Sequence, residues 1–224
     1  MWCVPKLDHE YLERMEDVLE LYERPLDPTR PVVCLDEKPV VLHGNARPVL
    51  RMEDASLRRD YEYRRLGTAN AFCCVQPLAG RHHIKVTSTR NALAFAEMIR
   101  DVSDRYPEAE IIHCVLDNLN THSVGALVKR FGEKEGLRLW RRFAFHFTPK
   151  HASWLNQAEI QISMFSRECI GKRRLAAIEI LKMEAGAWER NANERQRKID
   201  WRFSRNAARK KFKYQVSTAD ELSE

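Results

Sequence analysis

The sequence predicts an α/β protein, a mixed sheet flanked by helices, and three observations lead to this fold class. Short apolar runs typical of strands occur at 32–35, 71–75, 84–86, 111–116 and 143–147. Segments with an apolar face at helical spacing alternate with the later runs, and turn-forming residues separate the two kinds of segment. The order is strands first, then strand and helix alternating, then helices, which is typical of a sheet with helices packed on its faces.

The first elements are a helix and a short strand. Apolar residues recur on one face at 9–24, and the prolines that follow end this helix. The run 32–35 predicts a strand that stops at Asp36, and Pro39 limits its pairing further on. The polar, arginine-rich segment 43–65 predicts a loop or an exposed hairpin.

The middle of the chain predicts a hairpin, a helix and a buried strand. Two apolar runs flank the turn residues 77–80, which favours a hairpin. Thr89 or Asn91 caps the next helix. The nearly unbroken apolar run 111–116 is typical of a strand buried on both faces, and it closes at Asp117.

The last part of the chain becomes helical and basic. A helix at 123–131 leads through a charged stretch, 132–142, to the last strand. Ser153 opens a helix that carries Glu159 at the edge of its apolar stripe, and 175–212 is helical. We therefore expect three parts: a helical lead-in at 1–30, a central domain at 31–172 and a basic helical region at 173–224 that packs on or extends from it.

Composition limits the cellular setting. The 224 residues are 44% hydrophobic, which is enough for a sizeable core. The chain has no apolar run of 18 residues and no signal segment after Met1, so we expect a soluble, cytoplasmic protein with no membrane partner. Its six cysteines are scattered without a CxxC pair, which favours buried reduced thiols over a zinc site.

Basic charge is concentrated near the C-terminus. The chain has a net charge of +6, yet nine basic side chains and one acid lie between Arg195 and Lys213. This segment therefore carries +8, and the rest of the chain is slightly acidic. An acidic body with a cationic end suits a polyanionic partner held near a metal site.

Three acidic residues lie at positions that suggest metal chemistry. Asp36 and Asp117 each follow a predicted strand, where ligand sites of α/β sheets gather. An ionised carboxylate beside a core is costly unless a cation pairs with it, and Glu159 on its helix has the same need. Oxygen ligands suit Mg²⁺ or Mn²⁺, and two such ions about 3.5 to 4 Å apart can promote phosphoryl transfer.

A structural interpretation of these acids stays open at this point. The chain has 32 acidic residues, and an aspartate after a strand is most often a turn former or a helix cap. Glu37, Glu168 and His122 are similar cases. On pattern alone, the two glutamates are interpreted as surface residues and the histidine as a loop residue.

Six stretches in order carry a resemblance to a known family. They are VVCLDEKPV (32–40), DYEYRRLGTAN (60–70), PLAGRHHIKVT (77–87), VLDNLNTHS (115–123), FTPKHASWLNQAEI (147–160) and, more weakly, DWRFSRNAARKKF (200–212). From about Trp2 to Tyr214 the sequence resembles the mariner-like transposases of bacterial insertion sequences, the insertion-sequence-630 group of the DDE superfamily. The resemblance implies an RNase H-like catalytic domain at 31–172.

The resemblance also implies a reaction and its metal ligands. The Asp of DEKP, the first Asp of DNLNTH and the Glu of WLNxxE fall on Asp36, Asp117 and Glu159. They would hold Mg²⁺ or Mn²⁺, as two ions, for hydrolysis at element ends followed by attack of the freed 3′ hydroxyl on target DNA. The implied partners are double-stranded DNA, as element ends and target, and a second copy in a synaptic homodimer. The implied location is the bacterial cytoplasm, at the nucleoid.

Several basic residues are candidate DNA contacts. Lys150 and His151 precede the catalytic helix, whose N-terminus would favour a phosphate. Arg64 and Arg65 are candidates for the DNA path, although a solvated, charged hairpin is the default interpretation. The C-terminal candidates are Arg202, Arg205, Arg209 and Lys210. Asn118, Asn120 and His122 are expected to shape the loop after the second Asp.

Two departures from the family pattern lead to further expectations. Asp117 and Glu159 are 42 positions apart, and we expect the excess over the usual spacing as a surface insertion at 132–142. Family members carry helix-turn-helix domains before this region, so we expect a fragment or one product of a split element that cuts poorly alone. The alternative function is a catalytically incompetent remnant that binds only DNA or a partner. The DEKP, DNLNTH and WLNxxE motifs disfavour a general RNase H-like nuclease.

Overall fold

A mixed sheet of five strands forms the centre of the molecule. The computed structural model describes residues 7–58, 60–117, 119 and 121–215. The strand order is β5-β4-β1-β6-β7, in which β1, β4 and β5 are antiparallel neighbours and β6 and β7 run parallel to β1. The strands are β1 (Val32–Asn45), β4 (Tyr63–Gln76), β5 (Arg81–Thr87), β6 (Ile112–Leu116) and β7 (Phe143–Phe147). The predicted α/β class is confirmed.

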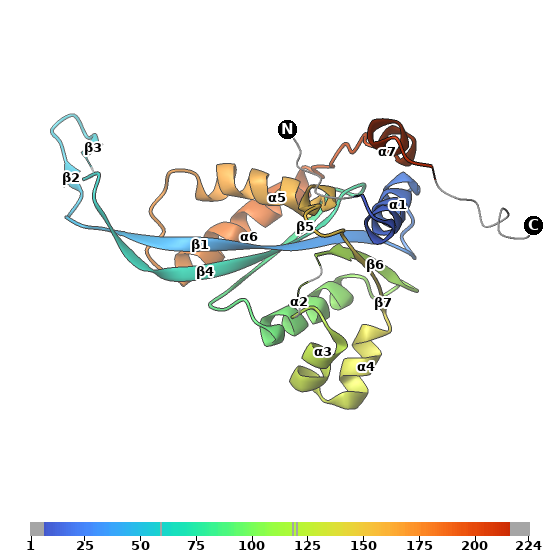
Figure 1. The fold of residues 1–224 in the computed structure, drawn as a ribbon. Helices are drawn as coiled ribbons and strands as arrows, with labels where there is room; N and C mark the ends of the chain where they lie inside the picture. The colour runs from blue at the N-terminus through green and yellow to red at the C-terminus, as the bar shows by residue number, and fades with distance from the viewer. Residues whose placement is uncertain (1–6, 59, 118, 120, 216–224) are drawn as a thin grey trace, which may run out of the picture.

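Helices cover both faces of this sheet (Figure 1). One layer is formed by α2 (Ala92–Arg105), α3 (Val124–Phe131) and α4 (Glu133–Trp140), which share a core with β1, β6 and β7. The other is formed by α5 (Ala158–Phe165) and α6 (Ile178–Glu194), which share a core with β1, β4 and β5. The helices α1 (His9–Glu23) and α7 (Arg205–Phe212) lie together at one end of the sheet. The sheet thus lies between two helical layers.

Alternation along β1 assigns its side chains to the two layers. Val33 and Leu35 pack in the core that contains α2, whereas Val40 and Leu42 pack in the core that contains α5 and α6. Since successive side chains of a strand point to opposite faces, odd-numbered residues near the start of β1 face α2 and even-numbered residues face α5.

β1 and β4 continue beyond the body of the protein as a long arm (Figure 1). Their pairing extends to Asn45 opposite Tyr63, and β2 (Leu50–Arg51) pairs with β3 (Leu57–Arg58) at the tip. The expectation that the first strand stops at Asp36 was wrong, and Pro39 does not limit its pairing, because it lies opposite Asn70 of β4. β6 pairs only with residues 32–34 of β1. At Pro39 the side of β1 toward β6 therefore has no partner strand, and a residue without an N–H is tolerated.

The charged stretch 132–142 is not a loose surface insertion. It contains α4, which packs against α3 and buries Leu139. A Cβ at Gly136 would lie 2.6 Å from the Val128 backbone nitrogen, so the glycine allows the two helices to approach closely. The prediction of a surface insertion overlooked the apolar residues between the charges. Their burial makes this segment part of the α2 layer.

Two further helix boundaries differ from the prediction. Ser153 begins a short 3₁₀ turn, Ser153–Leu155, and α5 begins only at Ala158. The region 175–212 contains two helices, α6 and α7, rather than one continuous helical stretch. Among the described residues, no helix is long and apolar enough to cross a membrane. The five described cysteines are buried free thiols.

Candidate active site

Asp36 and Asp117 are neighbours on adjacent parallel strands. The register of β1 and β6 pairs Val33 with Cys114 and Cys34 with Val115. Two residues further along both strands, the chains reach Asp36, within β1, and Asp117, directly after β6. The two carboxylates, 81 positions apart in sequence, therefore come from the same level of the sheet.

Asp36 lies within a strand rather than at its end. It belongs to the even-numbered residues of β1 and so faces the α5 layer. One of its oxygens, Oδ1, accepts a hydrogen bond of 2.7 Å from the backbone amide of Glu37. The carboxyl is partly buried and has one fixed local partner.

Asn156 brings Glu159 to this edge of the sheet. The Asn156 Nδ2 donates to the backbone oxygen of Leu35 at 2.8 Å, and its Oδ1 accepts from the Ala158 amide at 3.1 Å. The first contact attaches the segment to β1 next to Asp36, and the second satisfies an amide at the start of α5. Glu159 lies in the first turn of α5 and is exposed.

The charges of the two other acids act on Asp36, although the ligand atoms of the three acids do not form a group within 4.8 Å of one another. Burial is the largest cause of a raised pKa at Asp36, and the charges of Glu159 and Asp117 raise it further, to about 7. The hydrogen bond from the Glu37 amide acts in the opposite direction. Negative charge is therefore in excess at this point, and a divalent cation would offset it.

The donor set fits a hard divalent cation. Asp117 Oδ1 is buried and makes no hydrogen bond of its own with the described residues, but it lies at ion-pair distance, 3.2 Å, from the His122 Nδ1. All three candidate ligands are carboxylates, which suit Mg²⁺ or Mn²⁺ rather than a softer metal. We therefore retain Asp36, Asp117 and Glu159 as the candidate metal ligands.

Two residues that sequence reasoning left at the surface or in a loop are buried beside this site. Glu37 is 8% exposed and His122 is 5% exposed. The interpretation of Glu37 as a surface residue was wrong, because its odd position on β1 directs it into the α2 layer. His122 follows the loop after Asp117 but packs inside, with its ring centroid 4.4 Å from that of Phe95.

Glu37, Asp117 and His122 form a group whose donor atoms lie within 4.8 Å of one another. Burial alone would lower the pKa of the His122 imidazole, but hydrogen bonds with Asp117 and Glu37 raise it to about 9. Both ring nitrogens are engaged in these hydrogen bonds. An imidazole in this state is a partner of the acids rather than a metal ligand.

Lys150 and His151 remain candidate phosphate contacts, and of the three candidate ligands only Asp117 lines the same cavity. Both are exposed, and they line a cavity of about 670 Å³ together with Asp117 and Arg14. His151 has a left-handed backbone with φ 64°. The cavity combines one carboxylate of the site with cationic side chains.

The other candidate DNA contacts are spread over two surfaces. Arg64 and Arg65 are exposed on the arm. At the C-terminus, Arg205 contacts Glu23 and Arg209 contacts Glu16, at 2.8 and 2.7 Å, so both attach α7 to α1. Arg202 pairs with Asp200, and Lys210 is exposed.

Asn118 and Asn120 lie outside the described residues. Glu168, exposed as expected, pairs with Arg197.

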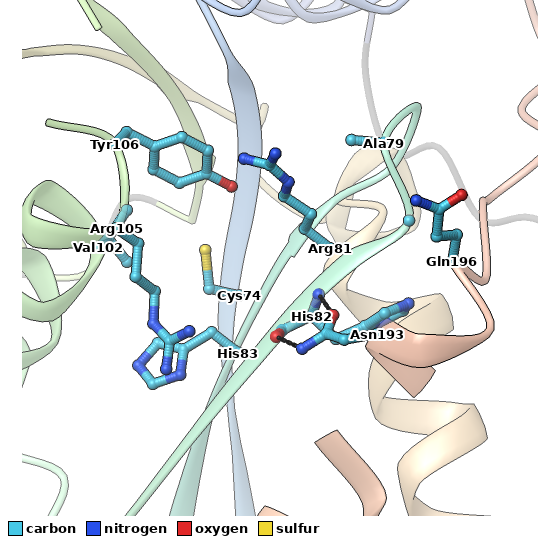
Figure 2. A pocket seen from close by; sticks show the side chains of 11 residues that line it. Cys74, Ala79, Arg81, His82, His83, Val102, Arg105, Tyr106, Asn193 and Gln196 are labelled. Atoms are coloured by element: carbon cyan, nitrogen blue, oxygen red, sulfur yellow. Dashed lines mark hydrogen bonds between the residues drawn. The ribbon is translucent and has the colours of Figure 1, made fainter. Parts of the chain in front are cut away.

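A second cavity, of about 360 Å³, lies away from the carboxylates (Figure 2). It opens between α2, β5 and the end of α6, and Figure 2 shows Arg81 and Tyr106 reaching toward each other across it. Its lining includes Arg81 and Arg105 and no carboxylate. This cavity therefore lacks the carboxylate ligands that Mg²⁺ or Mn²⁺ would need.

The fold and the carboxylates define a class of protein, the RNase H-like enzymes that carry out phosphoryl transfer on nucleic acid. A family model described as DDE superfamily endonuclease matches residues 31–182, more than half of the chain. The chain therefore belongs to the DDE superfamily of endonucleases. No curated protein is significantly similar to it.

Solved structures share the fold at low sequence identity. The Mos1 mariner paired end complex with Mn is 14% identical, with a TM-score of 0.53, over 88% of this chain and 63% of that chain. The Mos1 transposase paired-end complex with left transposon end is 14% identical, with a TM-score of 0.54, over 88% and 62%. The Mos1 strand transfer complex is 13% identical, with a TM-score of 0.54, over the same shares. The chain thus spans less than two thirds of these relatives, and the similarity confirms the RNase H-like fold.

Proposed function

We propose that this chain is a transposase catalytic domain, which cleaves DNA strands and transfers them during transposition of a bacterial insertion sequence. The observation that supports it is the placement of Asp36 and Asp117 at the same level of two adjacent parallel strands, with Glu159 in the first turn of α5, which Asn156 attaches to β1. Membership of the DDE endonuclease superfamily supports the same reaction type.

The residues of the chain would act mainly by positioning. Asp36, Asp117 and Glu159 would hold two Mg²⁺ or Mn²⁺ ions, which supply electrophilic stabilisation and an activated nucleophile when bound. Asn156 keeps the Glu159 turn against β1. Lys150 and His151 would neutralise a phosphate of the bound strand at the mouth of the cavity.

The proposed partners are double-stranded DNA and a second copy of the chain. Solved structures that share the fold include paired-end complexes of the Mos1 transposase. The arm carries exposed apolar side chains, notably Leu50, Leu57 and Tyr61, at 64%, 60% and 86% exposure. These support contact with another copy in a synaptic homodimer. The proposed location is the nucleoid of the bacterial cytoplasm.

A cleavage assay tests the proposed function. Duplex DNA that carries an element end, or a nicked duplex, would be incubated with Mg²⁺ or Mn²⁺ and the wild type, Asp117→Asn or Glu159→Gln. Asp104→Asn, which changes an exposed acid of α2, is the matched control. We expect wild type and control to release 3′ hydroxyl ends and both site variants to release at least 100-fold less product, because metal binding is lost. Equal product from wild type and Asp117→Asn would overturn the enzymatic proposal and leave a protein that only binds DNA.

A further inference from the structure

Glu37 and His122 form a buried charged pair behind the candidate metal ligands. The His122 Nε2 lies 2.9 Å from Glu37 Oε1, and the two side chains are 0% and 2% exposed. The residues are 85 positions apart, so the contact joins the loop after β6 to the middle of β1. A buried carboxylate without a partner would be strongly destabilising, so the two residues require each other.

The other nitrogen of the same imidazole contacts Asp117. The His122 Nδ1 lies 2.9 Å from the Asp117 backbone oxygen and 3.2 Å from its Oδ1. A carbonyl oxygen only accepts hydrogen bonds, so Nδ1 carries a hydrogen and donates it there. The Oδ1 atom stays within ion-pair distance without receiving that hydrogen. The ring thus fixes the backbone of Asp117 and leaves its carboxylate oxygen available.

The pair lies on the opposite face of the sheet from Asp36. Neighbouring residues of β1 point to opposite faces, so Asp36 faces α5 while Glu37 faces α2. The Phe95 side chain of α2 packs on the His122 ring with an interplanar angle of 30°, which limits movement of the ring. Asp117 therefore contacts a rigid support that reaches it from behind the site.

We propose that Glu37 and His122 are positioning residues, which hold Asp117 in the geometry needed to bind the divalent cation. The inference rests on the proposed function, because it concerns the same metal site. Residues that orient a metal ligand generally change metal affinity about 10- to 100-fold when they are replaced. A support of this kind explains why two ionisable groups are buried together where a hydrophobic pair would pack equally well.

The chain offers a matched control for the test. His83 of β5 lies 3.3 Å from Glu189, and these side chains are 11% and 14% exposed. This pair is also buried and joins a histidine to a glutamate, but it lies two strands away from β1 in the sheet. Its removal should lower stability without reaching the metal ligands.

The experiment measures Mn²⁺ affinity by electron paramagnetic resonance of the unbound ion, together with thermal unfolding in the absence of metal. We expect His122→Gln and Glu37→Leu to weaken Mn²⁺ binding about 10- to 100-fold. Glu37→Gln, which keeps an oxygen acceptor for the ring, should recover most of the affinity. His83→Gln should lower the Tm and keep the Mn²⁺ affinity within about twofold of wild type.

A second measurement on the wild type covers the case in which the variants do not fold. We expect saturation with Mg²⁺ to shift the imidazole ¹⁵N resonances of His122 and to leave those of His83 unchanged. An unshifted His122, or wild-type Mn²⁺ affinity in a folded His122→Gln, would overturn the proposal. Asp117→Asn distinguishes failure of the proposed metal site from failure of the positioning proposal. If Asp117→Asn keeps wild-type Mn²⁺ affinity, the proposed metal site is refuted. If Asp117→Asn loses Mn²⁺ affinity while His122→Gln keeps it, only the positioning proposal is refuted.

Discussion

Replacing Asn156 with alanine tests how the catalytic helix is fixed to the sheet. The side chain is 1% exposed and makes hydrogen bonds with the Leu35 carbonyl and the Ala158 amide, both in buried residues. Alanine removes both of these buried hydrogen bonds. Because an unsatisfied buried group costs about 1–3 kcal/mol, we expect the free energy of unfolding to fall by about 2–4 kcal/mol.

The same change should affect the metal site. For a chain of this size, 1 kcal/mol corresponds to about 2–4 °C in Tm, so the Tm should fall by about 4–16 °C. Without Asn156, the turn that carries Glu159 is no longer attached beside Asp36. We therefore expect weaker Mn²⁺ binding and slower strand cleavage at a temperature where the variant is still folded.

Asn193 provides the control for this prediction. It also makes two hydrogen bonds with one backbone segment, accepting from the His82 amide at 2.7 Å and donating to the His82 oxygen at 2.9 Å (Figure 2). Asn193→Ala should lower the Tm and keep wild-type Mn²⁺ affinity, because it lies at the second cavity. If Asn156→Ala also keeps wild-type affinity and cleavage, Asn156 has only a structural effect and the reasoning is refuted.

Two further predictions concern the charged surfaces. Burial alone would raise the pKa of Glu16, but hydrogen bonds from Arg209 and Tyr214 lower it overall, so this carboxylate stabilises the fold above its ordinary pKa and loses the effect as pH falls. Glu16→Gln should therefore cost up to about 1 kcal/mol at pH 7 in urea unfolding and less at pH 3; a constant difference would contradict this. Lys150→Ala should reduce the slope of log affinity against log salt by about 0.9 in DNA binding, whereas Lys182→Ala, exposed on α6, should leave the slope unchanged. An unchanged slope for Lys150→Ala would exclude a phosphate contact there.

Elements with a strong local pattern could be predicted from the sequence. The strand 143–147 was predicted with the bounds that the structure has, and 111–116 differs from β6 by one residue. Both are apolar runs between charged or turn-forming segments, so their burial is visible locally. Asn91 was a predicted cap, and its side chain accepts from the Ala94 amide at the start of α2.

The arm could not be predicted in the same way. The outer half of β4 is exposed on both faces, so neither an apolar run nor an alternation marks it as a strand. Its conformation is imposed by pairing with β1, which continues past a register shift between Leu42 and His43 out to Asn45 opposite Tyr63. Pairing between two polar segments leaves little signal in either of them alone.

The candidate site could be predicted only in part for a related reason. The acids at 36, 117 and 159 stand in motifs that resemble a family, so the sequence makes them candidates. Glu37, His122 and Asn156 stand in the same motifs, but their burial could not be predicted, because a polar residue is buried only when a distant partner is present. One signal was available. Neighbouring residues of a strand face opposite sides of the sheet, so the acid that directly follows Asp36 must face the helical layer opposite to the one that Asp36 faces.

This adjacency has a consequence for folding. A shift of β1 by one residue against its neighbours would exchange the two acids, placing Glu37 toward α5 and Asp36 toward Phe95. The protein would then hold a carboxylate in each layer but in the wrong chemical setting, with His122 facing a shorter side chain. Correct alignment of this strand is therefore a precondition for catalysis as well as for stability, and a misaligned molecule could look folded while remaining inert.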